Sequence, residues 1–332
     1  MTKKRVLYIL DHYPQISETY IENELRQLVG RYEIRVLALR EPDMRYDNHF
    51  SFTRIKSKEH LAELARAFRP DVVHGHYTVV ANALAFVARL LDRPFTLRSH
   101  SFDVVGPIEE KLDKYVPFLT DQRCLGILGF PFARPILARA GVPEERLHDC
   151  WPVVDYARFH DEGPNGKAIM NVGACIPKKN MEDYVRFGTL LPGRTSNLYP
   201  LGYQTQKIDA LNREMGEPIV IKDSRQPEDM PAEYKKHEWL VYTASPAMRS
   251  VGWPMAVAEA QAAGVGVCMQ NIRPDLAEYV CPGGYLFDRI EEAAEIVSQP
   301  FPEDRRQQGF AQARKSDVAS HIELLERLWQ AA

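Results

Sequence analysis

Short apolar runs alternate with segments of helical period along the whole chain. In the first half, the apolar runs are RVLYIL, EIRVLAL, DVVHGH, FTLRSH, CLGILG and LHDCWPV. Amphipathic segments such as KEHLAELARAFR and ANALAFVARLL lie between them and have helical spacing. Runs that are apolar throughout are typical of strands buried on both faces. Their alternation with helices predicts a parallel sheet covered by helices.

The same alternation occurs in the second half, where AIMNVGA, SNLYPLG, PIVIKD, WLVYTA, GVGVCM and GGYLFD are expected strands. The predicted fold class is therefore α/β, with two doubly wound Rossmann-like domains facing each other across a cleft. We expect a first domain at 1–153 and a second at 154–316, divided within the turn-rich stretch PVVDYARFHDEGPNGK. The last helix, at 317–332, has an apolar stripe and is expected to pack back on the first domain.

Composition narrows the class of protein and its partners. The hydrophobic fraction of 45% and the charged fraction of 26% are those of a soluble globular protein. A net charge of -3 gives no sign of a nucleic-acid partner. The five cysteines form no CxxC pair, which favours reduced thiols and a cytoplasmic location. No apolar run is long enough to span a bilayer, and peripheral contact with the inner face of the membrane stays open.

Polar residues follow several predicted strands, and ligands of doubly wound sheets bind at the carboxyl ends of strands. His12 and Tyr13 follow the first strand, and Ser17 is the expected N-cap of the next helix. His74 and His76 end a later strand, where a polar lining is favoured over a metal site. His100 and Asp103 follow the next strand. That pair suits either hydrogen bonding to a sugar, with proton placement, or simple capping of a loop.

The second half contains two loop–helix junctions with the chemistry of a nucleotide site. Gly173 ends a strand, and Lys178 and Lys179 stand at the start of the next helix, where a diphosphate binds well. Further on, Gly252 precedes a helix of small residues that contains Glu259. A carboxylate there can accept two hydrogen bonds from the vicinal hydroxyls of a ribose. Neither GxGxxG nor GxxxxGK[ST] is present.

The order of these motifs resembles that of the GT-B glycosyltransferases, specifically the retaining, nucleotide-sugar-dependent glycosyltransferase family four. YPQISETYIENEL resembles the family's FPxxSETFIxxEI, and PDVVHGHY and RSHSFD resemble PDxxHxH and HxxD. VVDYARF resembles GVDxxxF, and VGACIPKKN resembles VGRLxxxKG. GWPMAVAEAQAAG resembles EGWPxxxxEAMAxG, the most specific of the set. The resemblance covers nearly the whole chain.

The resemblance implies a set of roles. Glu259 would hold the nucleotide ribose, Lys179 would neutralise the donor diphosphate, and His100 would lie near the transferred sugar. The full predicted site has catalytic His100 and Asp103; donor-binding Lys179, Glu259, Lys178, Gly173, Arg249, Gly252, Trp253 and Ser17; and acceptor-side His12, Tyr13 and His76. The chain has no DxD motif, so we expect no metal and no cofactor. The implied reaction moves a sugar from a nucleotide-sugar to a saccharide or lipid-linked acceptor, with retention, in cell-surface polysaccharide or glycoconjugate synthesis.

Two departures from the family pattern keep alternatives open. Val251 stands where the family has a Glu that contacts the donor sugar, and Ala174 stands where it has an Arg beside the Lys. Arg249 or Lys178 could replace the missing cation. The alternatives are a catalytically impaired sugar-nucleotide-binding protein and a nucleotide-sugar epimerase of the same fold. Another alternative, inverting transfer with His12 as the general base, is disfavoured by the SETYI context.

Overall fold

The structure is a computed structural model, and it describes residues 3–45, 47, 49–105, 112–248 and 250–330. The chain divides into two compact units. Unit 1 comprises Met1–Val153 with Val318–Ala332, and unit 2 comprises Val154–Asp317. Each unit has its own sheet and its own apolar core.

Unit 1 contains a parallel sheet of seven strands in the order β3-β2-β1-β4-β5-β6-β7. The strands are β1 Arg5–Leu10, β2 Glu33–Ala38, β3 Phe52–Arg54, β4 Val72–His76, β5 Phe95–Arg98, β6 Cys124–Gly129 and β7 Leu147–Asp149. Strand β1 pairs with β2 on one side and with β4 on the other, so the strand order reverses between β1 and β4. The central strands β1, β4 and β5 are buried almost throughout, because helices cover both faces of the sheet.

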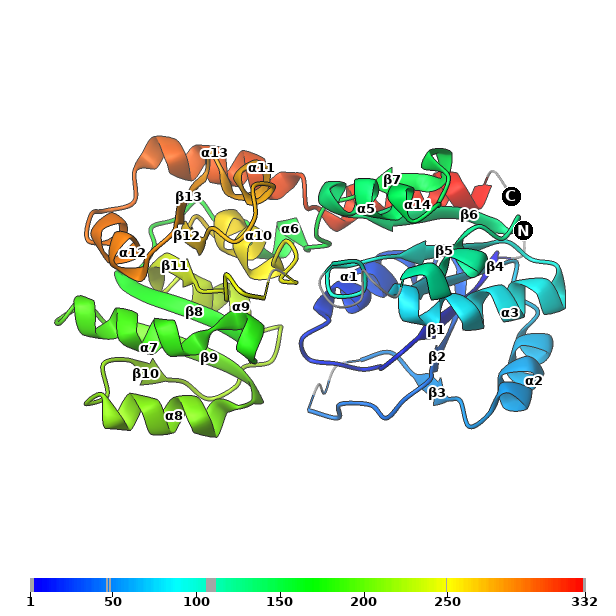
Figure 1. Ribbon diagram of the computed structural model, residues 1–332, viewed down its shortest axis with the longest axis horizontal. Helices are drawn as coiled ribbons and strands as arrows, with labels where there is room; N and C mark the ends of the chain where they lie inside the picture. Colours follow the sequence, from blue (N-terminus) through cyan, green and yellow to red (C-terminus); the bar gives the residue numbers. More distant parts are fainter. Residues whose placement is uncertain (1–2, 46, 48, 106–111, 249, 331–332) are drawn as a thin grey trace. The chain divides into compact units, whose positions relative to one another are not determined.

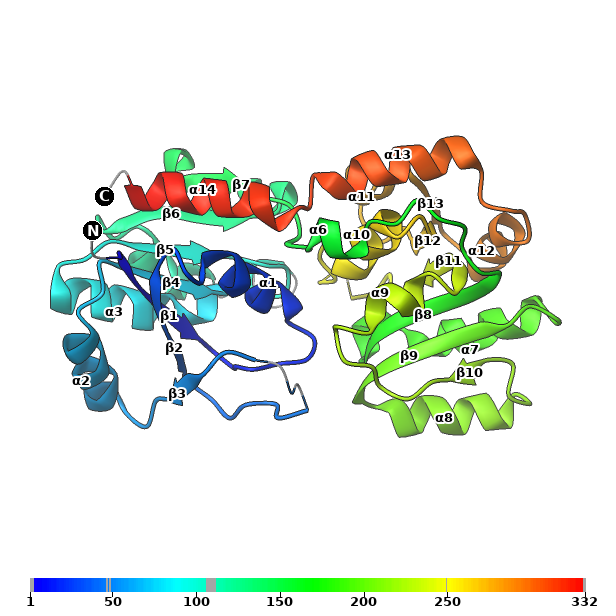
Figure 2. The same cartoon turned by 180° about the vertical axis from the view of Figure 1, so that it is seen from behind.

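The helices of unit 1 are α1 Thr19–Leu28, α2 Lys58–Phe68, α3 Ala81–Leu91, α4 Val116–Leu119, α5 Arg134–Arg139 and α14 Val318–Gln330. Helices α2 and α3 pack against each other over one face, as Figure 1 shows. On the other face, visible in Figure 2, α14 packs against α1. The C-terminal helix is tied to the sheet by Lys4 Nζ, which donates to the Trp329 carbonyl at 2.6 Å, and by Trp329 Nε1, which donates to Thr96 Oγ1 at 2.9 Å.

Unit 2 contains a second parallel sheet, of six strands in the order β10-β9-β8-β11-β12-β13. The strands are β8 Ala168–Cys175, β9 Ser196–Tyr203, β10 Val220–Ile221, β11 His237–Tyr242, β12 Gly266–Gln270 and β13 Gly284–Phe287. The helices are α6 Tyr156–Phe159, α7 Met181–Leu190, α8 Thr205–Glu214, α9 Met230–Tyr234, α10 Met255–Ala262, α11 Leu276–Val280, α12 Ile290–Val297 and α13 Glu303–Arg314. Helix α7 packs with α8 and α12, and α10 packs with α6 and α13.

The predicted α/β class with two doubly wound parallel sheets is confirmed. The predicted N-cap at Ser17 is wrong. Helix α1 begins at Thr19 after Glu18, and its N-cap residue makes no side-chain hydrogen bond. Strand β3 and helices α12 and α13 were not predicted: β3 has only three residues, and α13 is too polar to show an apolar stripe. Within the described ranges, no helix is long and apolar enough to cross a membrane.

Candidate active site

The carboxyl ends of the strands that flank a reversal of strand order are the usual ligand-binding place in a doubly wound sheet. In unit 2 the reversal lies between β8 and β11. The loop after β8 contains Lys178 and Lys179, and the loop after β11 leads into α10, which contains Glu259. The topology therefore brings the predicted donor-binding loops to one edge of the unit 2 sheet.

The Lys179 side chain passes so close to Gly173 that only a glycine fits at that position. Gly173 has a φ of +146°, and a Cβ atom built on it would overlap Lys179 Nζ. The Lys179 side chain thus folds back along the end of β8, and its ammonium lies 5.5 Å from the centre of the Tyr242 ring. Burial lowers the pKa of Lys179 to about 8, and the nearby Cys175 and Glu259 partly oppose this shift. A desolvated cation of this kind interacts strongly with a phosphate.

Glu259 lies on α10 within electrostatic reach of Lys179. Its Oε2 accepts a hydrogen bond of 2.8 Å from the Tyr234 hydroxyl. Burial raises the pKa of Glu259, while Tyr234, Arg158 and Lys179 pull it down. Among the described residues, no salt bridge or hydrogen bond joins the Glu259 carboxylate directly to the Lys179 ammonium. Both groups are therefore held near each other, and the carboxylate keeps capacity to accept further hydrogen bonds from a ligand.

The start of α10 suits an anion. The helix begins after Pro254, its N-cap makes no side-chain hydrogen bond, and its first turn has no acidic residue. The first N–H groups of a helix carry partial positive charge, which favours a phosphate at this position. A ring stack and a hydrogen bond fix the start of α10. The ring centroids of Trp253 and Tyr279 are 4.9 Å apart with an interplanar angle of 3°, and the Tyr279 hydroxyl donates to the Pro254 carbonyl at 2.6 Å.

Trp253 lies in the loop that leads into α10. Its side chain is only 2% exposed, and its Nε1 donates to Asp275 Oδ2 at 2.8 Å. It therefore holds the loop before α10 in place, and its contact with the donor stays a prediction. Gly252 remains partly exposed next to it. Val251 is buried, and its carbonyl accepts a hydrogen bond from Arg273, so the position of the family's first Glu is an apolar part of the core here.

The cation that the family has at position 174 is absent, because Ala174 is buried in the end of β8. Lys178 is partly exposed, and its carbonyl accepts from the Ser245 N–H at 2.9 Å, which ties the loop after β8 to the loop after β11. Arg249, the other predicted substitute, lies outside the described residues, so its role stays a prediction. Arg158 was missed by sequence analysis, although it lies within electrostatic reach of Glu259.

In unit 1 the reversal of strand order lies between β1 and β4, and His100 lies in the loop after the neighbouring strand β5. Its ring packs against two tyrosines, with centroids 4.5 Å from Tyr20 and 4.3 Å from Tyr77. The hydroxyls of the two tyrosines are hydrogen-bonded to each other, and Tyr77 donates to Glu18 Oε1 at 2.8 Å. Burial raises the pKa of Glu18 to about 7. Contacts with these two rings thus restrict the orientation of the His100 ring.

The Asp103 carboxylate holds the backbone of two loops in place. Its Oδ1 accepts from the His100 N–H at 2.9 Å, and its Oδ2 accepts from the Thr78 N–H at 2.8 Å. The side chain is fully buried, so the arrangement matches the loop-capping alternative and not direct proton transfer to a substrate. Asp103 is consequently a positioning residue that joins the loop after β5 to the loop after β4.

The predicted acceptor-side residues differ in exposure. The His12 side chain is 33% exposed, and its Nδ1 lies 3.1 Å from Asp11 Oδ2. Tyr13 is buried and donates to Glu22 Oε1, so its predicted contact with an acceptor is revised to a role in the core. His76 is also fully buried and reaches His100 instead of solvent. Ser17 is exposed in the loop before α1.

A buried polar cluster beneath His100 was missed by sequence analysis. Its centre is the carboxylate of Glu24 on α1, which is fully buried. Glu24 Oε1 accepts from the Tyr8 hydroxyl at 2.6 Å and lies 3.3 Å from Nε2 of both His74 and His76. Glu24 Oε2 accepts from His321 Nε2 on α14. Burial alone would raise the pKa of Glu24, but the surrounding histidines hold it well below its usual value.

The cluster also has the spacing of a metal site. Ligand atoms of Glu24, His74 and His76 lie within 4.8 Å of one another. His321 does not extend this set. Its Nδ1 lies 3.0 Å from an Arg98 nitrogen, which can only donate, so its Nε2 must carry the proton given to Glu24. Hydrogen bonds join Tyr8, His76 and His321 to the Glu24 carboxylate, whereas His74 Nε2 has no hydrogen-bond partner among the described residues.

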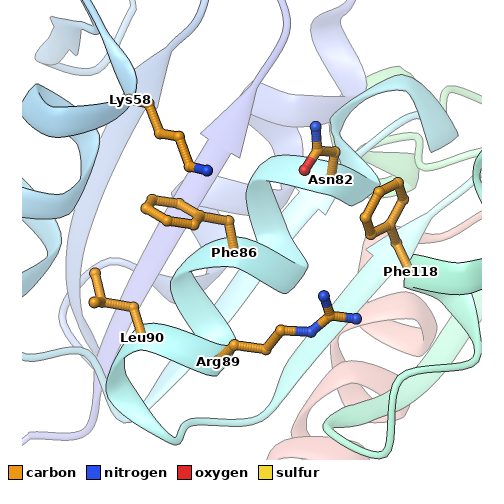
Figure 3. A pocket seen from close by; sticks show the side chains of 6 residues that line it. All are labelled: Lys58, Asn82, Phe86, Arg89, Leu90 and Phe118. Carbon is orange, nitrogen blue, oxygen red and sulfur yellow. The ribbon is translucent and has the colours of Figure 1, made fainter.

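A hollow of about 340 Å³ lies on α2, α3 and α4 of unit 1 (Figure 3). The Lys58 ammonium lies 4.5 Å above the Phe86 ring there, and Arg89 Nε lies 2.6 Å from Asp121 Oδ2. The hollow is lined by Lys58, Asn82, Phe86, Arg89, Leu90 and Phe118. None of these is a predicted site residue, and both cations already have partners, so we do not place the active site in this hollow.

Comparison with known proteins agrees with the arrangement of strands and loops. Residues 2–117 match the family model of glycosyl transferase 4-like domains. HepE from Anabaena, whose structure was solved in complex with UDP-glucose, superposes with a TM-score of 0.78 and 13% identity, covering 98% of this chain and 100% of HepE. The chain has the GT-B glycosyltransferase fold.

Other solved structures of this fold extend the likeness. Sucrose-phosphate synthase from Thermosynechococcus elongatus matches with a TM-score of 0.72 and 13% identity, covering 99% of this chain and 100% of the other. A glycosyltransferase from Rickettsia africae matches with a TM-score of 0.70 and 12% identity over 100% of both chains. A comparison with curated proteins finds no match. The match to the glycosyl transferase 4-like model is confined to residues 2–117, and the likeness to the solved structures is one of fold.

Proposed function

We propose that this GT-B chain is a glycosyltransferase that moves a sugar from a nucleoside-diphosphate sugar to a saccharide or lipid-linked acceptor. The observation that carries the proposal is the placement of Lys179 and Glu259 at the reversal of strand order in unit 2. A desolvated ammonium, an uncapped helix start and a carboxylate together match a diphosphate followed by a ribose. The glycosyl transferase 4-like domain and the UDP-glucose bound by HepE support the same class of donor.

The proposed reaction requires that the negative charge developing on the leaving group be stabilised. Breaking the bond from the sugar C1 to phosphate oxygen leaves a nucleoside diphosphate with an additional negative charge. Lys179 and the first N–H groups of α10 would stabilise that charge without reorganising at the moment of reaction. We further propose that transfer proceeds with retention and without a bound metal. Support comes from the motif resemblance and from these fixed positive groups, which can take the place of a metal at the diphosphate.

A thermal-shift screen with UDP, GDP, TDP, CMP and their sugars tests the donor class. We expect the midpoint of unfolding to rise with one nucleoside diphosphate and with its sugar, because a ligand that binds only the folded state stabilises it. The matched variant is Lys179→Met, in which the rise should shrink at the same ligand concentration. No shift with any nucleotide would contradict the proposal. Binding without sugar transfer would favour the alternative of an impaired binding protein, which the buried Val251 and Ala174 support.

A further inference from the structure

A chain of hydrogen bonds runs from a buried arginine to His100 through residues distant in sequence. Arg98 on β5 donates to His321 Nδ1 on α14 at 3.0 Å, and His321 Nε2 reaches Glu24 Oε2 on α1. Glu24 Oε1 lies 3.3 Å from His76 Nε2 on β4, and His76 Nδ1 lies 3.1 Å from His100 Nε2. All five residues belong to unit 1, and none is more than 7% exposed.

Two groups fix the directions of these hydrogen bonds: the Arg98 guanidinium at one end and the Glu24 carboxylate in the middle. A guanidinium can only donate, so His321 Nδ1 accepts and His321 Nε2 donates to the carboxylate. An ionised carboxylate can only accept, so His76 must donate from Nε2 to Glu24. The low pKa of Glu24 keeps it ionised, and burial lowers the pKa of His76 to about 4, which keeps His76 neutral.

A neutral imidazole that donates from one nitrogen accepts at the other. His76 Nδ1 is therefore an acceptor, and His100 Nε2 must carry the proton that it receives. Burial, with the nearby charge of Arg98, lowers the pKa of His100 well below its usual value, so the second nitrogen stays unprotonated. Within the described part of the chain, His100 Nδ1 makes no hydrogen bond, and the ring packs against Tyr20 and Tyr77.

We propose that Glu24, acting through His76, fixes the proton of His100 on Nε2 and leaves His100 Nδ1 as an acceptor for a hydroxyl group of the bound sugar. Glu24 and His76 are then positioning residues, and α14 takes part because it supplies His321. The proton placement concerns the free protein alone. The contact with a sugar hydroxyl rests on the proposed function.

Nitrogen NMR of protein labelled with ¹⁵N-histidine tests the proton placement directly. His100 is assigned by comparison with His100→Gln, and the two ring nitrogens are distinguished by their couplings to the ring protons. In the unchanged chain at pH 7, we expect a neutral His100 with protonated Nε2 and unprotonated Nδ1. A neutral ring protonated on Nδ1, a doubly protonated ring, or a stoichiometric metal with metal-shifted His74 and His76 signals would overturn the proposal.

Glu24→Gln tests the coupling, because the amide can present its N–H₂ to His76 and reverse the chain. We expect His100 to show a mixed or reversed tautomer in this variant, with kcat lower by about tenfold or more, since a wrong tautomer disables a histidine that is otherwise in place. The matched control is Glu22→Gln, a buried carboxylate on the same helix that bonds to Tyr13 outside the chain. It should leave the His100 signals unchanged.

The His100 spectrum of Glu24→Gln decides the coupling: an unchanged spectrum would overturn it. Should Glu24→Gln fail to fold, the His100 spectrum of His76→Gln provides a second test. This variant removes the acceptor that faces His100 Nε2, so it should also alter the His100 tautomer. These spectra need no substrate. A chain with the expected spectra but no transfer activity would contradict the proposed function and leave the proton placement intact, so the two failures are distinguishable.

Discussion

Replacing Lys179 by Met removes the ammonium that faces the end of β8 while keeping a long, flexible side chain. We expect the variant to stay folded, because the Lys179 ammonium makes no ion pair or hydrogen bond with another described residue. The packing over the Tyr242 ring can be retained by the thioether. The lost interaction is with the ligand, so the expected effect is on nucleoside-diphosphate affinity and not on stability.

The size of the effect follows from the environment of the ammonium. A hydrogen bond to a charged group contributes about 1.5–3 kcal/mol, which corresponds to a loss of about 10- to 150-fold in UDP affinity. The pKa of Lys179 is lowered to about 8 by burial, so the group is charged below that pH and neutral above it in the free protein. Binding a diphosphate requires the charged form. Affinity should therefore be constant below pH 8 and fall above it, approaching about tenfold per pH unit.

Isothermal titration with UDP between pH 7 and 9.5 measures both quantities. The unchanged chain should lose affinity as the pH rises through about 8, and Lys179→Met should bind weakly without this dependence. Lys207→Met is the matched control, because that side chain is 65% exposed and its ammonium pairs with Glu182. Equal affinity of Lys179→Met and the unchanged chain, or an identical decline with pH in both, would refute the assigned role of Lys179.

Three further predictions concern the same edge of the unit 2 sheet. Gly173→Ala should lower the free energy of unfolding by about 1–3 kcal/mol in urea titrations and also weaken UDP binding, because the φ of +146° is strained with a side chain and the new methyl overlaps Lys179 Nζ. A variant as stable and as tight as the parent would refute this. Glu259→Ala should weaken UDP by more than about 0.5 kcal/mol and abolish any preference for UDP over its deoxyribose analogue; an intact preference would exclude the ribose contact. Transfer activity should survive excess EDTA, whereas complete loss that Mn²⁺ or Mg²⁺ restores would show that a metal is needed.

Local pattern was sufficient to predict most strands and helices. Strand β1 is apolar apart from its first residue and buried over most of its length, and a helix such as α3 shows its period within its own eleven residues. Prediction failed where the signal was short or polar. Strand β3 has three residues, and the N-cap of α1 is set by backbone geometry at Glu18, which Ser17 does not reveal.

Residues of the site were predictable when their role depends on their own loop. Lys179 follows a glycine-ended strand, and Glu259 stands among alanines on a helix, and both are visible in the sequence. The partners of Glu24 were not visible, because His321 is 297 residues away and meets it only through the packing of α14 on α1. Trp253 is predicted as a ligand contact because of its motif, and its ring also locks the loop before α10.

Glycosyl transfer itself is tested most directly by proton NMR of the chain incubated with the sugar nucleotide that binds best and with saccharide or lipid-linked acceptors. The account predicts a new glycoside whose anomeric signal has the same configuration as the donor sugar, released nucleoside diphosphate in equal amount, and neither product with Lys179→Met at matched protein concentration. An inverted anomeric signal would contradict retention. A donor that is bound and never consumed, or consumed by epimerisation without an acceptor, would contradict the assignment as a glycosyltransferase.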